Sequence, residues 1–242
     1  MMQIEPLGDM GIRIKFGNII SEDIHREIQQ FTSQLKDKPI NGIIEWVPSY
    51  TNVAIYYQPD IISYSDLITE LNTLYERTNK VEPFNSTVYE IPVYYGGEAG
   101  PDFSFIADST GVSEEEVIRL HSSQVYLIYM MGFVPGFPYL GGLPNQLAVP
   151  RLPHPRPSVL PGSVGIGGNQ TGIYPSEVPS GWRIIGRTPV KLFDIEDSPP
   201  VLLEAGNYLK FCPIDEAEFH RIKQLADEQK YTVTTYKRME AR

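Results

Sequence analysis

The sequence contains one cysteine, Cys212, and only four histidines among its 242 residues. A lone cysteine cannot form a disulfide within the chain, and it favours a reducing compartment. The histidines are scattered, and no two have the spacing of metal ligands; they are His25, His121, His154 and His220. The sequence therefore argues against a structural zinc site, and we predict no metal ligands in this chain.

Positive charge is scarce: 20 lysines and arginines stand against 30 aspartates and glutamates, which gives a net charge of −10. Nucleic acids and anionic membranes are bound through basic faces, so this balance argues against both as partners. Long apolar runs are missing too, and the segment "MMQIEPLGDMGIRIKFG" lacks the apolar core of a signal peptide. We therefore expect a cytoplasmic protein. Its 41% of hydrophobic residues suffices for an ordinary globular core.

The first third of the chain alternates short strands with amphipathic helices. "GIRIKFG" has the period-two pattern of a strand, and the segment 21–37 begins at Ser21, a capping residue, and spaces apolar side chains at helical intervals. The elements that follow are two strands, a helix and a strand, at 42–48, 52–58, 63–78 and 87–95. The order β-α-β-β-α-β predicts a ferredoxin-like domain, which we place at residues 1–81.

Residues 82–242 have a different pattern, dominated by strands. One helix is capped by Ser113, and a late amphipathic helix covers 215–230. The expected strands are 125–133, 183–195, 200–206, 208–214 and 231–236. Many short strands joined by turn-rich segments predict a barrel or a sandwich, and with it an α+β protein of two domains.

A stretch rich in glycine, proline and aromatic residues spans 132–172. Flexible linkers lack large apolar groups, so the aromatic content excludes a linker. A Walker loop needs a Gly-Lys-Ser/Thr sequence, whereas no lysine occurs between Lys80 and Lys191, and Gln170 stands where the dinucleotide fingerprint has its last glycine. The stretch therefore favours a rigid, aromatic wall of a binding site.

The cations of this wall are all arginines. Arg151 and Arg156 lie within it, and Arg183 and Arg187 follow downstream. Arginine presents a planar fork that suits carboxylate or phosphate oxygens. The alternative is that these arginines pair with local acids such as Glu177 or Asp194.

The chain resembles the allophanate hydrolase subunit 1 family in six segments that occur in order. They are "GDMGIRIKFG", "VPSYTNVAIYY", "YYGGEAGPD", "GFVPGFPYLGGLP", "PRLPHPRPSVLPGSVGIGG" and "QTGIYPSEVPSGWRIIGRTPVKLFD". The sequence departs from the family at "VPSGW", where the family usually reads Ser-Pro-Gly-Gly-Trp. Ser180 in place of glycine argues against a role that needs positive φ there. Gly181 and Trp182 are retained.

The resemblance implies a cyclophilin-like β-barrel over residues 82–242. It also implies that the chain is a subunit of an ATP-dependent complex that opens 5-oxoproline to L-glutamate. The expected partners are an allophanate hydrolase subunit 2-type protein and a lactam-utilisation-type subunit. ATP, with Mg²⁺, would be shared with these subunits. Since the chain lacks a Walker lysine and a nucleophile–base pair, we expect no activity from the lone subunit.

Activation of a lactam by phosphorylation rests on positioning and charge stabilisation, which suits arginines, amides and hydroxyls around a rigid pocket. The predicted catalytic residues are Arg151, Arg156, Gln170, Thr171 and Arg187. The predicted binding residues are Phe133, Phe137, Tyr139, Tyr174, Trp182, Thr188 and His121. The alternatives are that the aromatic side chains belong to the core and that His121 packs or caps. Glu98 and Asp102 would suit an acid/base or metal pair, but turn chemistry explains them as well, and we favour the turn.

Two other function classes are compatible with the same motifs. The surface rich in aromatic residues and proline would equally suit a binding module that inhibits a sporulation sensor histidine kinase. A subunit of a urea or amide carboxylase, or of an allophanate hydrolase-type assembly, is the third possibility, although this chain carries no biotin-attachment signature.

Overall fold

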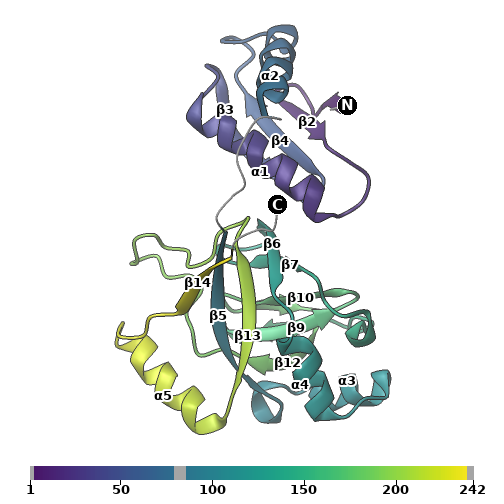
Figure 1. The fold of residues 1–242 in the computed structure, drawn as a ribbon, viewed down its shortest axis with the longest axis vertical. Helices are drawn as coiled ribbons and strands as arrows, with labels where there is room; N and C mark the ends of the chain where they lie inside the picture. The colour runs from purple at the N-terminus through teal and green to yellow at the C-terminus, as the bar shows by residue number, and fades with distance from the viewer. Residues whose placement is uncertain (1–2, 79–85, 239–242) are drawn as a thin grey trace. The chain divides into compact units, whose positions relative to one another are not determined.

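A computed structural model describes residues 3–78 and 86–238. These residues form two compact units, one from each range (Figure 1). The predicted domain boundary at 81/82 lies outside the described residues. Within the described part of the chain, the structure contains no helix with the length and apolarity needed to cross a membrane.

The first unit is a four-stranded antiparallel sheet with two helices. The sheet has the order β1-β2-β4-β3. Its elements are β1 (Gln3–Pro6), β2 (Gly11–Lys15), α1 (Glu22–Asp37), β3 (Ile43–Pro48), β4 (Asn52–Tyr57) and α2 (Tyr64–Thr78).

Local sequence explains most of these elements. Ser21 caps α1 as predicted, because its Oγ accepts the Ile24 N–H at 3.2 Å. On β2, Ile12 and Ile14 point to the side of the sheet that is buried. The core joins apolar side chains of the strands with those of both helices, including Phe31 on α1.

The predicted ferredoxin-like order is not confirmed, because the observed order is ββαββα. The strand expected to complete the domain is β5 (Ser86–Tyr95), which pairs within the second unit instead. The edge beside β2 is taken by β1, a four-residue strand that the sequence patterns did not predict. Its short segment, "QIEP", offers no alternating pattern to detect.

The second unit is built on an eight-stranded sheet with the order β10-β9-β12-β5-β13-β6-β7 and with β14 paired to β5. The two end strands, β7 and β10, lie beside each other, so the sheet is nearly closed. A separate pair joins β8 and β11. The strands are β6 (Tyr126–Met131), β7 (Pro138–Gly141), β8 (Arg156–Val159), β9 (Ser163–Gly167), β10 (Gln170–Ile173), β11 (Val178–Ser180), β12 (Arg183–Arg187), β13 (Tyr208–Ile214) and β14 (Thr234–Arg238).

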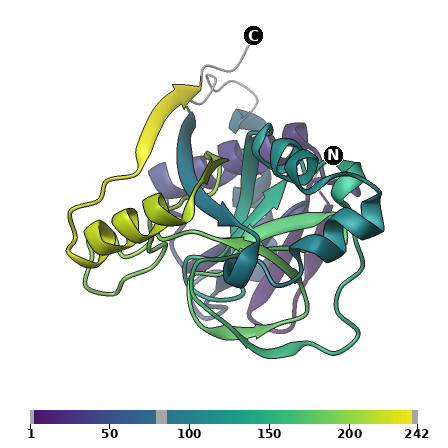
Figure 2. The same ribbon diagram turned by 90° about the horizontal axis from the view of Figure 1, so that it is seen from below.

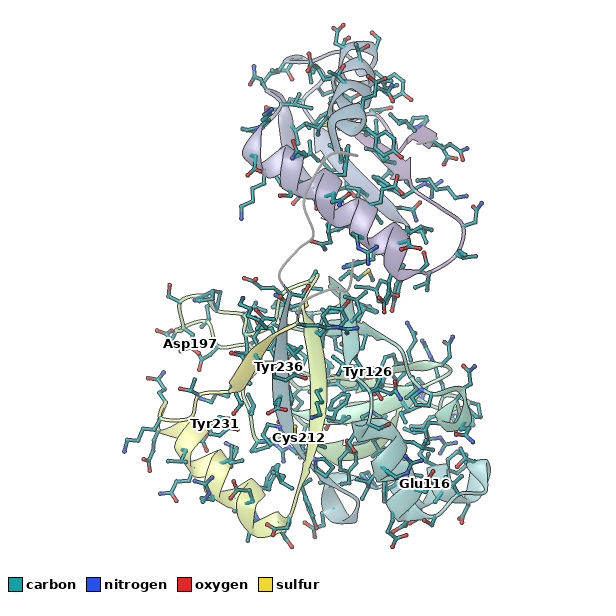
Figure 3. All side chains as sticks on the ribbon, viewed as in Figure 1. Glu116, Tyr126, Asp197, Cys212, Tyr231 and Tyr236 are labelled. Atoms are coloured by element: carbon teal, nitrogen blue, oxygen red, sulfur yellow. The ribbon has the colours of Figure 1, made fainter. Side chains whose placement is uncertain are left out.

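Three α-helices accompany this barrel-like sheet: α3 (Phe103–Thr110), α4 (Glu114–Ser122) and α5 (Glu216–Asp227). In Figures 1 and 2, α5 lies on one side of the sheet, while α3 and α4 lie on the opposite side. Ser113 caps α4 as predicted, since its Oγ accepts the Glu116 N–H at 3.2 Å. Figure 3 shows Glu116 on this outer helix, and Cys212 on β13. Cys212 is a free, half-buried thiol.

One predicted strand is wrong. Residues 200–206 form no strand and contribute only an isolated bridge, between Val201 and Phe193. The apolar character of this segment has another cause, because Leu203 is buried in the core of the second unit. Likewise, the strand expected over 183–195 ends at Arg187.

Candidate functional site

A pocket of about 350 Å³ opens in the second unit, between the strands β8, β9 and β12 and the first turns of α5. Arg156 and Arg187, two of the predicted catalytic residues, both line it. Apolar side chains from different elements, among them Val159 on β8 and Phe219 on α5, form part of its wall. The size is within the range of small-molecule sites.

A row of three polar residues crosses neighbouring strands on the wall of this pocket. Arg187 on β12 is directly opposite Tyr94 on β5 and directly opposite Ser163 on β9. All three residues line the pocket. The Arg187 Nε–H donates to the Pro161 carbonyl at 2.9 Å, and burial lowers the pKa of this guanidinium. An arginine side chain nevertheless stays charged in proteins.

The second arginine of the pocket is held by a buried carboxylate. Arg156 donates through both terminal nitrogens to the two oxygens of Asp102, each at 2.8 Å. The Arg183 Nη1 lies 3.7 Å from the same carboxylate. Asp102 also accepts the Ile184 N–H at 2.7 Å. Asp102 is only 6% exposed. The main effect of Arg156 and Arg183 is therefore to neutralise the buried charge of the Asp102 carboxylate.

The rim of the pocket is acidic. Glu98 precedes α3, and Glu216 lies in the first turn of α5. Both are exposed, as is His220, whose Nε2 lies 3.8 Å from a Glu216 oxygen. A ligand entering the pocket would therefore pass negative charge before it reached Arg187.

His121 lies apart from the pocket, in a fully buried hydrogen-bond chain. Its Nδ1 is 2.8 Å from the Tyr95 hydroxyl, and its Nε2 is 2.9 Å from the Thr171 hydroxyl. Thr171 donates its only hydroxyl proton to the Gly165 carbonyl at 3.1 Å, so it must accept from His121. Tyr95 then donates to Nδ1, and every polar atom of the imidazole has a partner.

Burial lowers the pKa of His121 to about 3, so the ring is neutral at physiological pH. It stacks on Phe211 at 4.3 Å between ring centroids. The hydroxyl of Tyr126, labelled in Figure 3, donates to the backbone carbonyl of His121 at 2.7 Å. His121 and Thr171 therefore lie in the core. For His121, this agrees with the alternative that it packs.

The predicted aromatic residues form a cluster of their own. Phe137, Tyr174 and Trp182 are buried and contact one another edge to face, and Tyr139 packs against Phe137. These side chains are mainly core. Phe133 differs, because it is 60% exposed and has a φ of 65°, a backbone conformation that is costly for a bulky residue.

Of the remaining predicted residues, Arg151 contacts this cluster. The Arg151 guanidinium lies 5.9 Å from the Trp182 ring centroid, within the range of a cation–π contact. Gln170 is half-buried at the start of β10. Thr188 is buried, and its hydroxyl accepts the Val190 N–H at 3.2 Å.

Ser180, where the sequence departs from the family pattern, has a structural role. Its Oγ is 2.7 Å from the Tyr174 hydroxyl and accepts the Trp182 N–H at 3.0 Å. Two positions that sequence patterns did not select, Tyr94 and Ser163, line the pocket with Arg187. Only strand register reveals them, because Tyr94 and Ser163 are far from each other in sequence.

Comparisons with known proteins agree on one family. The family described as "Carboxyltransferase domain, subdomain C and D" matches residues 2–203. The B subunit of the 5-oxoprolinase of Bacillus subtilis (strain 168) is 40% identical over 233 residues, which cover 92% of this chain and 97% of that protein. The corresponding 5-oxoprolinase protein from Escherichia coli O157:H7 is 39% identical over 210 residues, 87% of this chain and 95% of that one.

The fold recurs in a much larger protein. The urea amidolyase of K. lactis matches 98% of this chain with a TM-score of 0.80 and 20% identity, and the chain spans 16% of that protein. At this identity the likeness concerns the fold alone. Together with the matches over most of the sequence, these findings confirm the predicted resemblance. The chain belongs to the carboxyltransferase domain, subdomain C and D family.

Proposed function

We propose that this chain is a subunit of an ATP-dependent 5-oxoprolinase, which opens 5-oxo-L-proline to L-glutamate. The observation that carries the proposal is the 40% identity to the 5-oxoprolinase protein of Bacillus subtilis over 97% of its length. The pocket beside Arg187 supports it, because its size and its mixture of polar and apolar walls suit a small polar ring.

The chemistry explains why ATP is needed. Amide resonance makes a lactam carbonyl a poor electrophile, and phosphorylation of its oxygen makes an imidate-like species that water attacks more readily. Charge stabilisation by positioned donors is the main contribution a protein makes to such a transfer. In this chain, Arg187 is the candidate donor, and Arg156 fixes the pocket wall through Asp102.

Partner subunits complete the proposal. Both bacterial relatives are one subunit of a 5-oxoprolinase, so we assign the other catalytic parts to an allophanate hydrolase subunit 2-type protein and a lactam-utilisation-type subunit. Mg²⁺ would enter with ATP, since no group of three or more His, Cys, Asp or Glu side chains among residues 3–78 and 86–238 is placed to hold a metal. Our candidates for partner contact are the exposed Phe133 and Arg151, whose guanidinium lies over Trp182. We keep the cyclophilin-like assignment of the barrel as part of this proposal.

The test is reconstitution. The purified chain is combined with the two partner subunits, and glutamate formation from 5-oxoproline is measured with and without ATP. We expect turnover only when all three proteins and ATP are present. Mixtures that omit one protein at a time serve as controls.

Three results would contradict the proposal. Turnover by the lone chain would refute its dependence on partners. No turnover by the complete mixture, together with inhibition of sensor histidine kinase autophosphorylation by the lone chain, would favour the binding-module alternative. ATP-dependent carboxylation of urea by a complex containing this chain would favour the third alternative.

A further inference from the structure

The row formed by Tyr94, Arg187 and Ser163 has hydrogen-bond donors that the protein itself does not use. The Ser163 hydroxyl has no hydrogen-bond partner in the described ranges, although the residue is only 5% exposed. The Tyr94 hydroxyl likewise has no hydrogen-bond partner among the described residues, while the Tyr94 ring contacts the Phe219 ring. Arg187 uses its Nε on Pro161, and its two terminal nitrogens have no partner within residues 3–78 and 86–238.

These donors differ from the other polar groups of the pocket. The fork of Arg156 is occupied by Asp102, and the Ser158 hydroxyl donates to Glu177 at 2.6 Å. Ser163 lines the pocket, so a ligand bound there can supply the hydrogen-bond partner that its hydroxyl lacks within the described residues. Two hydroxyls beside a charged guanidinium form a set of donors that suits an oxyanion.

The charge around the row selects among oxyanions. A carboxylate brings one negative charge, whereas ATP brings several. The rim residues Glu98 and Glu216 repel a polyanion more strongly than a monoanion, and one unpaired guanidinium cannot neutralise a triphosphate. Val159 and Phe219 offer an apolar wall for the carbon skeleton of a small ligand.

We propose that Arg187, Ser163 and Tyr94 bind the carboxylate of a small monocarboxylic ligand, and that this ligand is 5-oxoproline. The identity of the ligand rests on the proposed function, whereas the carboxylate site rests on the pocket alone. Arg187 binds the two carboxylate oxygens, and the two hydroxyls donate to their remaining lone pairs. Arg156 takes no direct part, because Asp102 already occupies its fork.

The first experiment measures binding to the full chain by calorimetry. The ligands are 5-oxoproline, L-glutamate, inorganic phosphate, ATP and pyrrolidin-2-one, which is the same lactam without the carboxylate. We expect 5-oxoproline to bind and pyrrolidin-2-one to bind at least tenfold more weakly. Arg187→Gln should weaken 5-oxoproline binding about ten- to hundredfold, which is the effect of losing a charge-assisted hydrogen bond.

Matched variants separate the site from the fold. Arg221→Gln makes the same change on α5, where Arg221 forms an exposed pair with Glu218, and it should leave binding unchanged. Ser163→Ala should weaken binding severalfold without introducing a new charge, and it tests the site if Arg187→Gln proves unstable in thermal melting.

Several results would overturn the assignment. Equal binding of pyrrolidin-2-one and 5-oxoproline would show that the carboxylate is not recognised. Arg187-dependent binding of phosphate or ATP, without binding of 5-oxoproline, would make the row a phosphate site. Unchanged affinity in both Arg187→Gln and Ser163→Ala would exclude these residues.

The reconstituted complex distinguishes failure of the site from failure of the proposed function. If the complex hydrolyses 5-oxoproline, Arg187→Gln should raise KM for 5-oxoproline and leave KM for ATP nearly unchanged. An unchanged KM for 5-oxoproline would refute the site while the function stands. If the complex lacks this activity, the function fails, and the binding of carboxylates by the lone chain still decides the site.

Discussion

Asp102 is the residue whose replacement tests the architecture of the pocket most directly. Its carboxylate accepts a fork from Arg156, lies 3.7 Å from Arg183 and accepts the Ile184 N–H. The Asp102 N–H in turn donates to the Ile184 carbonyl at 2.9 Å. These bonds tie the start of α3 to β12 and fix one arginine of the pocket. The perturbation is Asp102→Asn, which removes the charge and keeps the shape.

The expected loss of stability is about 3 kcal/mol. Removing one partner of a buried ion pair typically costs about 3–5 kcal/mol, because the other charge stays buried without compensation. Here the Arg156 side chain is 30% exposed and regains some water, which favours the lower end. Asparagine can still accept the Ile184 N–H, so that bond is retained. With a urea m-value of about 3 kcal/mol/M, the midpoint should fall by about 1 M.

The assay is urea unfolding followed by tryptophan fluorescence. The chain has two tryptophans, Trp46 on β3 in the first unit and Trp182 in the second. A Trp46→Phe background makes the signal report the second unit alone. Asp108→Asn is the matched control, because Asp108 is exposed on α3 and the chemical change is identical. The control should stay within about 0.5 kcal/mol of the parent protein.

A cycle with Arg156→Gln adds a second check. The double variant should lose less stability than the sum of the two single variants, because each removes the same fork. Equal midpoints for Asp102→Asn and Asp108→Asn would refute the reasoning, and so would strict additivity. Either result would mean that the fork adds no stability and that Arg156 is available to a ligand.

Two further predictions concern the buried chain at His121. Thr171→Val should lower the stability of the second unit by about 1–3 kcal/mol, because the imidazole N–H loses its acceptor, whereas Thr171→Ser keeps the hydroxyl and should cost less; urea unfolding measures both. The pKa of about 3 for His121 lies below the 6.5 of an unfolded histidine, so only the unfolded state binds a proton as pH falls below about 6.5. Stability should therefore drop by up to about 1.4 kcal/mol per pH unit down to about pH 3. His121→Gln should flatten this slope between pH 6.5 and 5, and an unchanged slope would contradict the assignment. The Trp182 signal is required, because burial also lowers the pKa of His25 in the first unit, to about 4.

Elements specified by local patterns were predictable from the sequence. The caps at Ser21 and Ser113 and the apolar stripe of α1 depend on neighbours three or four residues away. The pairing of β5 was not predictable in this way, because it depends on β12, β13 and β14, which are far along the chain. That non-local pairing is why the predicted ferredoxin-like order failed.

The same distinction explains the arginines. Sequence proximity suggested Glu177 and Asp194 as their partners, yet Glu177 accepts from Ser158, and Asp194 pairs with Lys191 at 3.4 Å. The acid that binds Arg156 is Asp102, 54 residues away. Arg156 does pair with an acid, but not with a local one as the alternative expected, because only the fold brings Asp102 near it.

Within the segment between Lys80 and Lys191, which contains no lysine, the two pocket arginines make contacts that a lysine could not make. Arg156 must reach both oxygens of one carboxylate at once, which requires two parallel N–H donors on one plane. Arg187 must donate its Nε to Pro161 and still present its terminal nitrogens to the pocket. A lysine ammonium is a single point donor and satisfies neither geometry. Arg156 thus has a structural role and Arg187 has the ligand-binding role that we propose, and the matched changes Arg156→Lys and Arg187→Lys should separate the two roles. The first should lower the melting temperature, and the second should weaken carboxylate binding.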